Sequence, residues 1–222
     1  IYPDDPASYP CSLVGGRIGT SGWSLIGARY GHTRDLVLSF EIVLPTGDVI
    51  RVGDGGGRKT RKSSSGYQLK HLFMGHQGTL GIVTEATLRI LASAEGSRPV
   101  LFGFGSAEEA GQTVSGIIAA GIIPVAIEYM DKLAVEICES FAKAGYPDCE
   151  ALLIIEVEGS DAEIAEQLAR IKQIALAHDP VEFREAADED QAKRIWLGRK
   201  SAFGAMGQIN DYMCLDGTIP VS

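Results

Sequence analysis

The run "EALLIIEVEG", residues 150–159, contains five consecutive apolar residues, and Val157 continues the run after a single glutamate. A strand with one face in water alternates apolar and polar residues, whereas a near-continuous apolar run is typical of a strand covered on both faces. We therefore predict that this segment is a buried strand inside a sheet that other elements cover.

Strands and helices alternate on both sides of this run. Further strands are predicted for "PVLFGFG" (99–105), "PVAIEYM" (124–130) and "PVEFREA" (180–186). The predicted helices cover residues 106–120, 131–145, 160–175 and 188–206, and two of them begin with a capping box, Ser106 with Glu109 and Ser160 with Glu163. This order predicts an α/β or α+β fold: a small sandwich with helices on one face of an antiparallel sheet.

The N-terminal part has a different pattern. Residues 1–35 are rich in Pro and Gly, which predicts loops and one short helix near 15–22. "LVLSFEIVLPTGDVIRVG" (36–53) predicts two strands joined by a turn, and a loop and a short helix at about 67–74 follow. "GTLGIVTEATLRIL" (78–91) is the clearest strand. Its expected faces are Ile82, Thr84, Ala86, Leu88 and Ile90 on one side, and Val83, Glu85, Thr87 and Arg89 on the other.

Composition and charge limit the function classes. The net charge of −9 argues against a nucleic-acid partner, which would require a basic face. Residues 1–92 hold 10 Lys and Arg against 7 Asp and Glu, whereas residues 93–222 hold 10 against 22, a change that predicts two domains. Drift in surface composition is the alternative. No apolar run reaches the length of a membrane span.

Cysteine and histidine usage carries less information. The four cysteines, at 11, 138, 149 and 214, form no CxxC pair, which is typical of a reducing, cytoplasmic compartment. The four histidines show no ligand spacing, so we predict no metal site in this chain.

Two glycine clusters are the strongest candidates for a binding site. They are "GGRIGTSG" (15–22) and "GHQGTLG" (75–81). Glycine inside regular structure is unfavourable, but it lets backbone N–H and C=O groups approach a ligand without an intervening Cβ. Taken singly, each cluster is better explained by tight turns and close strand packing.

Three segments carry a resemblance to a known family. "ARYGHTRDLVLSFEIVLPTGDVIR" (28–51), "KSSSGYQLKHLFMGHQGTLGIVTEATLRI" (62–90) and "GRKSAFGAMG" with "LDGTIP" (198–207 and 215–220) resemble the FAD-linked D-2-hydroxyacid dehydrogenases of the vanillyl-alcohol-oxidase flavoprotein superfamily. The resemblance runs through essentially the whole chain in the same order. It implies a partial FAD-binding lobe, mostly β with short helices, followed by a ferredoxin-like cap domain.

The resemblance also implies the domain arrangement. Residues 1–92 resemble the second lobe of the FAD-binding domain, and residues 97–222 resemble most of the cap that forms the substrate pocket. The first FAD lobe is expected before Ile1. A histidine-rich segment that holds a metal and the general base is expected after Ser222. The chain is thus expected to be an internal segment, inactive alone, with no catalytic residue of its own.

Site residues follow from the resemblance position by position. The backbone expected to line the isoalloxazine and pyrophosphate of FAD is that of Gly15, Gly16, Ser21 and Gly22. The backbone expected to hold the adenosine portion is that of Gly78, Gly81, Ile82 and Val83, with Thr79 and Glu85 as weaker candidates. Arg199 resembles a cap arginine that binds the substrate carboxylate, a role that suits a guanidinium; a solvated helix arginine is the alternative.

The second glycine cluster departs from the family pattern at two positions. The family usually has Ser and Glu where this chain has His76 and Gln77, and for His76 a position in a surface turn is a sufficient explanation. The basic residues Arg58, Lys59, Arg61 and Lys62 could bind phosphate, but a solvated loop is favoured.

The resemblance implies an FAD-dependent oxidation of a small D-2-hydroxyacid, such as glycolate or D-lactate, by hydride transfer to the flavin. The resemblance does not identify the electron acceptor. It is compatible with a homodimer or with a partner subunit. It is also compatible with a cytoplasmic protein that lies peripherally at the inner membrane. The alternative is a non-catalytic binding or assembly module, or an inactive proteolytic fragment. A bare ferredoxin-like regulatory domain is disfavoured, because it leaves residues 1–92 unexplained.

Overall fold

The computed structural model describes residues 1–54, 60 and 62–219, and the chain divides into two compact units. The N-terminal unit comprises Ile1–Gly96 with the short segments Ile123–Ala126 and Glu158–Asp161. The C-terminal unit comprises the rest of the described chain from Ser97. Of the basic loop residues considered above, Arg58, Lys59 and Arg61 lie outside the described residues.

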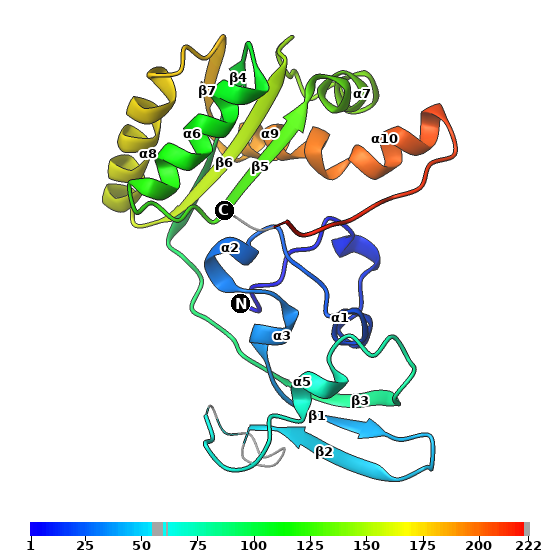
Figure 1. Cartoon of the computed structure of the whole chain (residues 1–222). Coiled ribbons are helices and arrows are strands. Elements are labelled where there is room, and N and C mark those ends of the chain that lie inside the picture. Colours follow the sequence, from blue (N-terminus) through cyan, green and yellow to red (C-terminus); the bar gives the residue numbers. More distant parts are fainter. Residues whose placement is uncertain (55–59, 61, 220–222) are drawn as a thin grey trace. The chain divides into compact units, whose positions relative to one another are not determined.

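The N-terminal unit contains a three-stranded antiparallel sheet in the order β2-β1-β3 (Figure 1). Its strands are β1 (Val37–Val43), β2 (Val49–Gly53) and β3 (Ile82–Leu88). Its described helices are short: η1 (Tyr9–Cys11), α1 (Val14–Thr20), α2 (Gly27–Tyr30), α3 (Thr33–Leu36) and α5 (Lys70–Phe73). The predicted hairpin at 36–53 is confirmed, since β1 and β2 pair from Val43 with Val49 to Ser39 with Gly53.

Strand β3 contains a β-bulge that the sequence pattern did not reveal. Glu85 pairs with Glu41, but Val83 pairs with the next residue, Ile42, so Thr84 is an extra residue in β3. The strict alternation predicted for this strand is therefore wrong. Val83 packs against the same core as Ala86 and Leu88, although the pattern placed it on the opposite face.

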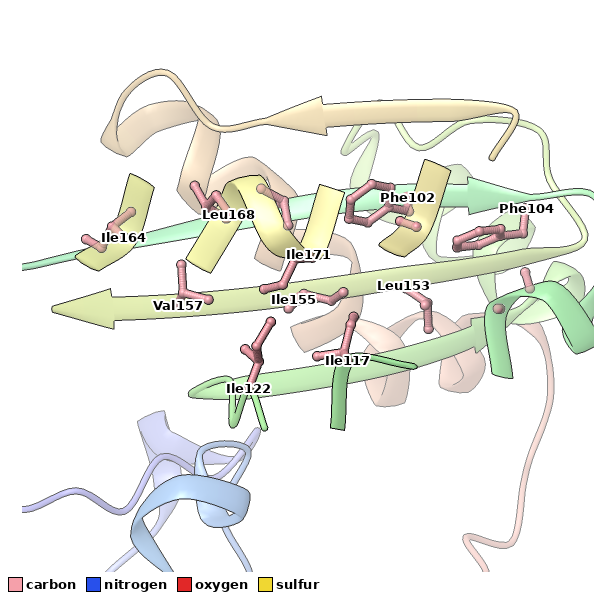
Figure 2. Packing of buried hydrophobic residues seen from close by; sticks show 14 residues of the cluster. Phe102, Phe104, Ile117, Ile122, Leu153, Ile155, Val157, Ile164, Leu168 and Ile171 are labelled. Atoms are coloured by element: carbon pink, nitrogen blue, oxygen red, sulfur yellow. The ribbon is translucent and has the colours of Figure 1, made fainter. Parts of the chain in front are cut away.

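The C-terminal unit is built on a four-stranded sheet in the order β5-β6-β4-β7. Its elements are, in chain order, β4 (Gly96–Phe104), α6 (Ala107–Ala119), β5 (Ala126–Asp131), α7 (Lys132–Ala142), β6 (Ala151–Gly159), α8 (Asp161–Leu176), β7 (Glu182–Glu185), α9 (Glu189–Lys200) and α10 (Ala202–Ile209). Neighbouring strands run in opposite directions (Figure 2). This strand order is that of a ferredoxin-like sheet, with α7 inserted between the two strands that such a fold normally joins directly.

Helices cover both faces of this sheet. On one face, Phe102 and Ile155 of the strands pack against Ile117 of α6 and Ile171 of α8 (Figure 2). On the other face, Leu152 packs in a separate cluster with residues of α7 and α9, among them Val135, Cys138 and Ile195. The prediction that the helices lie on one face of the sheet is therefore wrong, whereas the prediction from the apolar run that its central strand is covered on both faces is confirmed. The apolar run 151–155, which is buried at every position, gives the physical reason, because each of its two faces must be removed from water.

Candidate functional site

The two glycine clusters of the N-terminal unit lie around a single hollow of about 470 Å³. The hollow lies between α1, the turn before β3 and the first residues of β3. Its lining residues are Gly15, Gly16, Gly19, Thr20, His76, Gln77, Gly78, Gly81, Ile82 and Val83. Six of the eight residues predicted to contact a cofactor thus lie around one hollow. They come from two segments that are more than 60 positions apart in the sequence.

Backbone hydrogen bonds hold the two walls of the hollow together. The N–H of Gly75 donates to the carbonyl of Ile18 at 3.0 Å, and the N–H of Gln77 donates to that of Gly19 at 2.8 Å. Ile18 is itself fully buried in the core of the unit. The carbonyl groups of the last turn of a helix have no N–H partner within the helix. In α1, those of Ile18 and Gly19 accept hydrogen bonds from the backbone of the opposite wall.

The turn that forms this wall requires left-handed backbone. Thr79 N–H donates to the His76 carbonyl at 2.8 Å, and the two residues between them have positive φ, 48° at Gln77 and 81° at Gly78. This is a type I′ turn, which favours glycine in its second central position. The glycine at 78 is thus already explained by local conformation.

The glycine at 81 has another cause. A Cβ at this position would lie 2.5 Å from the carbonyl oxygen of Val43 and less than 3 Å from the Ile42 side chain. With a φ of 155°, Gly81 lets β3 start in close contact with β1.

Neither positive φ nor close packing explains the glycines at positions 15 and 16. Both lie in α1, neither has a positive φ, and a Cβ at either position would meet nothing within 4 Å among the described residues. Each glycine is less favourable in a helix than alanine by about 1 kcal/mol. Their effect is to leave the backbone of α1 bare where it lines the hollow.

Ser21 and Gly22 are not among the lining residues. Ser21 ends α1 in left-handed conformation with a φ of 50°. A Cβ on Gly22 would lie 2.5 Å from the guanidinium of Arg17, which forms an ion pair with Asp4. Both residues therefore shape the segment that follows the α1 wall, and their contact with a cofactor stays a prediction.

The weaker candidates make contacts within the chain. The Thr79 hydroxyl donates to the His76 carbonyl. Glu85 forms an ion pair with Arg51 at 3.0 Å on the exposed face of the sheet, and the hydrogen bonds that Arg51 donates to this carboxylate raise the pKa of Arg51. Neither residue lines the hollow.

Four lining residues, Gly19, Thr20, His76 and Gln77, were not predicted as site residues. Gly19 belonged to the quoted cluster, so its position among glycines was a usable signal. His76 was noted only as a departure from the family pattern. In the structure its Nδ1 accepts a hydrogen bond from Gly78 N–H at 2.9 Å, whereas its buried Nε2 has no partner in the described part of the chain.

Arg199 belongs to the C-terminal unit, in the last turn of α9. Its Nε donates to Oε2 of Glu128 at 2.8 Å, and both side chains are largely buried. Its backbone N–H donates to the Tyr146 hydroxyl at 2.9 Å, and this hydroxyl donates to the Ile195 carbonyl at 2.6 Å. Burial raises the pKa of Tyr146, so the hydroxyl keeps its proton for the bond to Ile195.

The described residues contain neither a helix that could span a membrane nor a cluster of metal ligands. No helix there is both long and apolar enough to cross a bilayer. No group of three or more His, Cys, Asp or Glu side chains in that part of the chain is arranged to hold a metal ion.

Comparison with protein families gives two matches. Residues 94–222, more than half of the chain, match the C-terminal domain of FAD linked oxidases. Residues 1–53 match an FAD binding domain.

Individual relatives agree with these matches. Glycolate oxidase subunit GlcD of Escherichia coli (strain K12) is 38% identical over 99% of this chain and 43% of its own length, and the Bacillus subtilis (strain 168) subunit GlcD is 38% identical over 100% and 47%. A probable mitochondrial D-lactate dehydrogenase of Danio rerio is 33% identical over 92% of this chain and 40% of its own length. The chain therefore spans less than half of these relatives.

Solved structures show the same fold. An alkyldihydroxyacetonephosphate synthase superposes with a TM-score of 0.71 at 22% identity, over 94% of this chain and 39% of its own. A p-cresol methylhydroxylase with bound substrate superposes with a TM-score of 0.59 at 16% identity, over 79% and 41%. Because the match to the C-terminal domain of FAD linked oxidases covers more than half of the chain, this chain belongs to the FAD-linked oxidase family.

Proposed function

We propose that this chain is part of an FAD-dependent oxidoreductase that oxidises a small D-2-hydroxyacid such as glycolate or D-lactate. The match of residues 1–53 to an FAD binding domain and the names of the relatives support the cofactor and the substrate class. When bound, FAD would supply the acceptor for the hydride from the substrate α-carbon. The protein residues would bind and orient the two reactants.

The residues around the hollow fit such a cofactor. The carrying observation is the pair Gly15 and Gly16, whose missing side chains are explained by neither turn nor packing, and which leave bare backbone at the wall of the hollow. The side chains of Ile82 and Val83 add apolar surface beside that backbone. Bare backbone next to apolar side chains suits a flat aromatic ring system.

We assign cofactor contact by backbone to Gly15, Gly16, Gly78 and Gly81, with Ile82 and Val83 beside them. Ser21 and Gly22 are kept in the proposal as the residues that end and support the α1 wall.

For the substrate we propose Arg199. A 2-hydroxyacid carries a carboxylate, and a guanidinium can bind it with two parallel hydrogen bonds. Glu128 already engages Nε of Arg199, so the substrate would bind the terminal nitrogens. Glu128 and the Tyr146 hydroxyl would then act as positioning groups for this arginine.

The domain assignment also remains part of the proposal: residues 1–92 as the second lobe of an FAD-binding domain and residues 97–222 as a cap. A cytoplasmic location and association as a homodimer or with a partner subunit remain predictions from the sequence.

The test uses the native polypeptide that contains these residues, purified with its bound flavin. We expect an FAD absorption spectrum and reduction of an artificial dye with glycolate or D-lactate, and much slower reduction with L-lactate. A polypeptide that retains no FAD when FAD is added, and reduces no dye, would support the non-catalytic module instead. The 222-residue chain alone is expected to be inactive.

A further inference from the structure

His76 presents an unpaired hydrogen-bond donor in the wall of the hollow. Its Nδ1 accepts the Gly78 N–H at 2.9 Å, so this nitrogen carries no proton and the neutral ring carries its proton on Nε2. The Nε2 atom is buried and makes no hydrogen bond within the described residues. A buried N–H without a partner is unfavourable, so its retention calls for an acceptor.

The surroundings of Nε2 point to a ligand. His76 lines the hollow together with Gly19, and a Cβ on Gly19 would lie 4.0 Å from Nε2. The absent side chain at 19, like those at Gly15 and Gly16, leaves this side of α1 open beside the imidazole. The donor therefore lines the same hollow as the bare backbone to which the proposed function assigns the cofactor.

The lining also indicates which part of a cofactor fits. None of the described residues that line the hollow is an Asp, Glu, Lys or Arg. A pyrophosphate is normally bound with cationic side chains or a full helix N-terminus, whereas an uncharged ring requires apolar surface and one or two neutral donors. Ile82, Val83 and the neutral His76 match the second requirement.

We infer that His76 donates its Nε2–H to an oxygen or nitrogen acceptor on an uncharged ring of the bound flavin nucleotide. This inference rests on the proposed function and adds a residue to it. The interpretation of His76 as part of a surface turn remains correct for Nδ1, which supports the turn through Gly78. The Nε2 atom has a second, separate role.

Two substitutions separate these roles. In His76→Asn the side-chain oxygen can still accept the Gly78 N–H, but the Nε2 donor is lost. In His76→Gln an amide N–H reaches the region of Nε2, but the acceptor for Gly78 is lost. His71→Asn, at an exposed position of α5 outside the hollow, is the matched control.

The measurements are the FAD dissociation constant, from quenching of flavin fluorescence in the apo form of the native polypeptide, and the melting temperature. We expect His76→Asn to bind FAD about 3- to 10-fold more weakly at an unchanged melting temperature, the scale of one hydrogen bond. His76→Gln should stay closer to the wild-type affinity but melt earlier. Unchanged affinity in His76→Asn, with FAD bound by the wild type, would overturn the inference and leave the proposed function intact.

The imidazole ¹⁵N resonances supply a second readout. In the apo protein the Nε2 nitrogen should show a directly bonded proton, and its resonance should shift when FAD binds. FMN and AMP identify the ring: a shift with FMN assigns the isoalloxazine, and a shift with AMP assigns the adenine. An Nε2 signal that does not respond to bound FAD contradicts the inference, and a wild type that binds no FAD removes both the inference and the proposed function.

Discussion

At the residue scale, the glycines around the hollow are glycines for different physical reasons. Gly78 satisfies a turn that requires positive φ, and Gly81 allows a contact with Val43 that any Cβ would block. Gly15 and Gly16 meet no such requirement. The sequence alone does not distinguish these four glycines. The structure does, and only Gly15 and Gly16, which neither a turn nor close packing explains, are direct evidence for a ligand.

This difference predicts opposite effects on stability and binding. Gly15→Ala and Gly16→Ala should each increase the free energy of unfolding by about 0.5–1 kcal/mol, because alanine is the better helix former and the space is open. Both should weaken FAD binding, because a methyl group then stands in the hollow. Denaturant unfolding and FAD titration measure the two effects.

Gly111→Ala in α6 is the matched control for this prediction. Gly111 also lies in a helix, and a Cβ there would meet none of the described residues within 4 Å, but Gly111 does not line the hollow. It should give the same gain in stability with no change in FAD affinity. If Gly15→Ala and Gly16→Ala leave the FAD affinity unchanged, as this control does, the backbone of α1 does not contact the cofactor.

Arg199 allows a second prediction at this scale. In the native polypeptide, Arg199→Ala should weaken binding of the 2-hydroxyacid by about 2–4 kcal/mol, the scale of losing one partner of a buried charge pair. Glu128→Ala removes the same ion pair but keeps the guanidinium, so it should raise KM much less. Equal changes in KM for the two variants would mean that Arg199 serves only the ion pair.

At the element scale, the backbone hydrogen-bond pattern of α9 is interrupted by the side chain of Tyr146, which lies outside the helix. The Tyr146 hydroxyl lies between the Ile195 carbonyl and the Arg199 N–H, two groups that a regular α-helix joins directly. Gly198 makes room for the ring, because a Cβ there would lie 2.4 Å from it. The end of α9, and with it the position of Arg199, is therefore set by a tyrosine from outside the helix.

Removing this hydroxyl should loosen the end of α9. Tyr146→Phe is expected to lower the free energy of unfolding by about 1–3 kcal/mol, because a buried N–H and C=O lose their partner. Tyr67→Phe, at a position that is 93% exposed, should have no effect. Urea unfolding curves compare the two, and equal stability of both variants would show that α9 closes its own ladder without cost.

Strand β3 shows what limits prediction at the element scale. The alternation of apolar and polar residues correctly identified the strand, but it could not show that Thr84 is an extra residue opposite β1. A bulge is defined by the partner strand, and the partner lies about 40 positions earlier in the chain. The bulge determines that Val83 faces the core while Ile82 is 70% exposed at the hollow.

At the scale of the whole molecule, the C-terminal unit is a sheet with a core on each side. Leu152 and Leu153 are neighbours in β6, both fully buried, and they belong to the two different cores. Leu152→Ala and Leu153→Ala should each lower the free energy of unfolding by about 2–5 kcal/mol. Leu133→Ala, at a 62% exposed position of α7, should cost far less. A near-neutral result for Leu152→Ala or Leu153→Ala would mean that one face is not covered.

The sequence by itself determined the strands and most helices, the two glycine clusters and the family, because apolar periodicity, turn residues and motif order are local properties of a chain. The tertiary structure alone decided which helices cover each face of the second sheet, that β3 is bulged, and that six of the predicted residues surround one hollow while Ser21 and Gly22 do not. It also showed that the buried Nε2 of His76 has no hydrogen-bond partner among the described residues. The physical reason is common to all of these: burial, register and hydrogen-bond pairing depend on groups that are distant in sequence, and they exist only once the chain has folded.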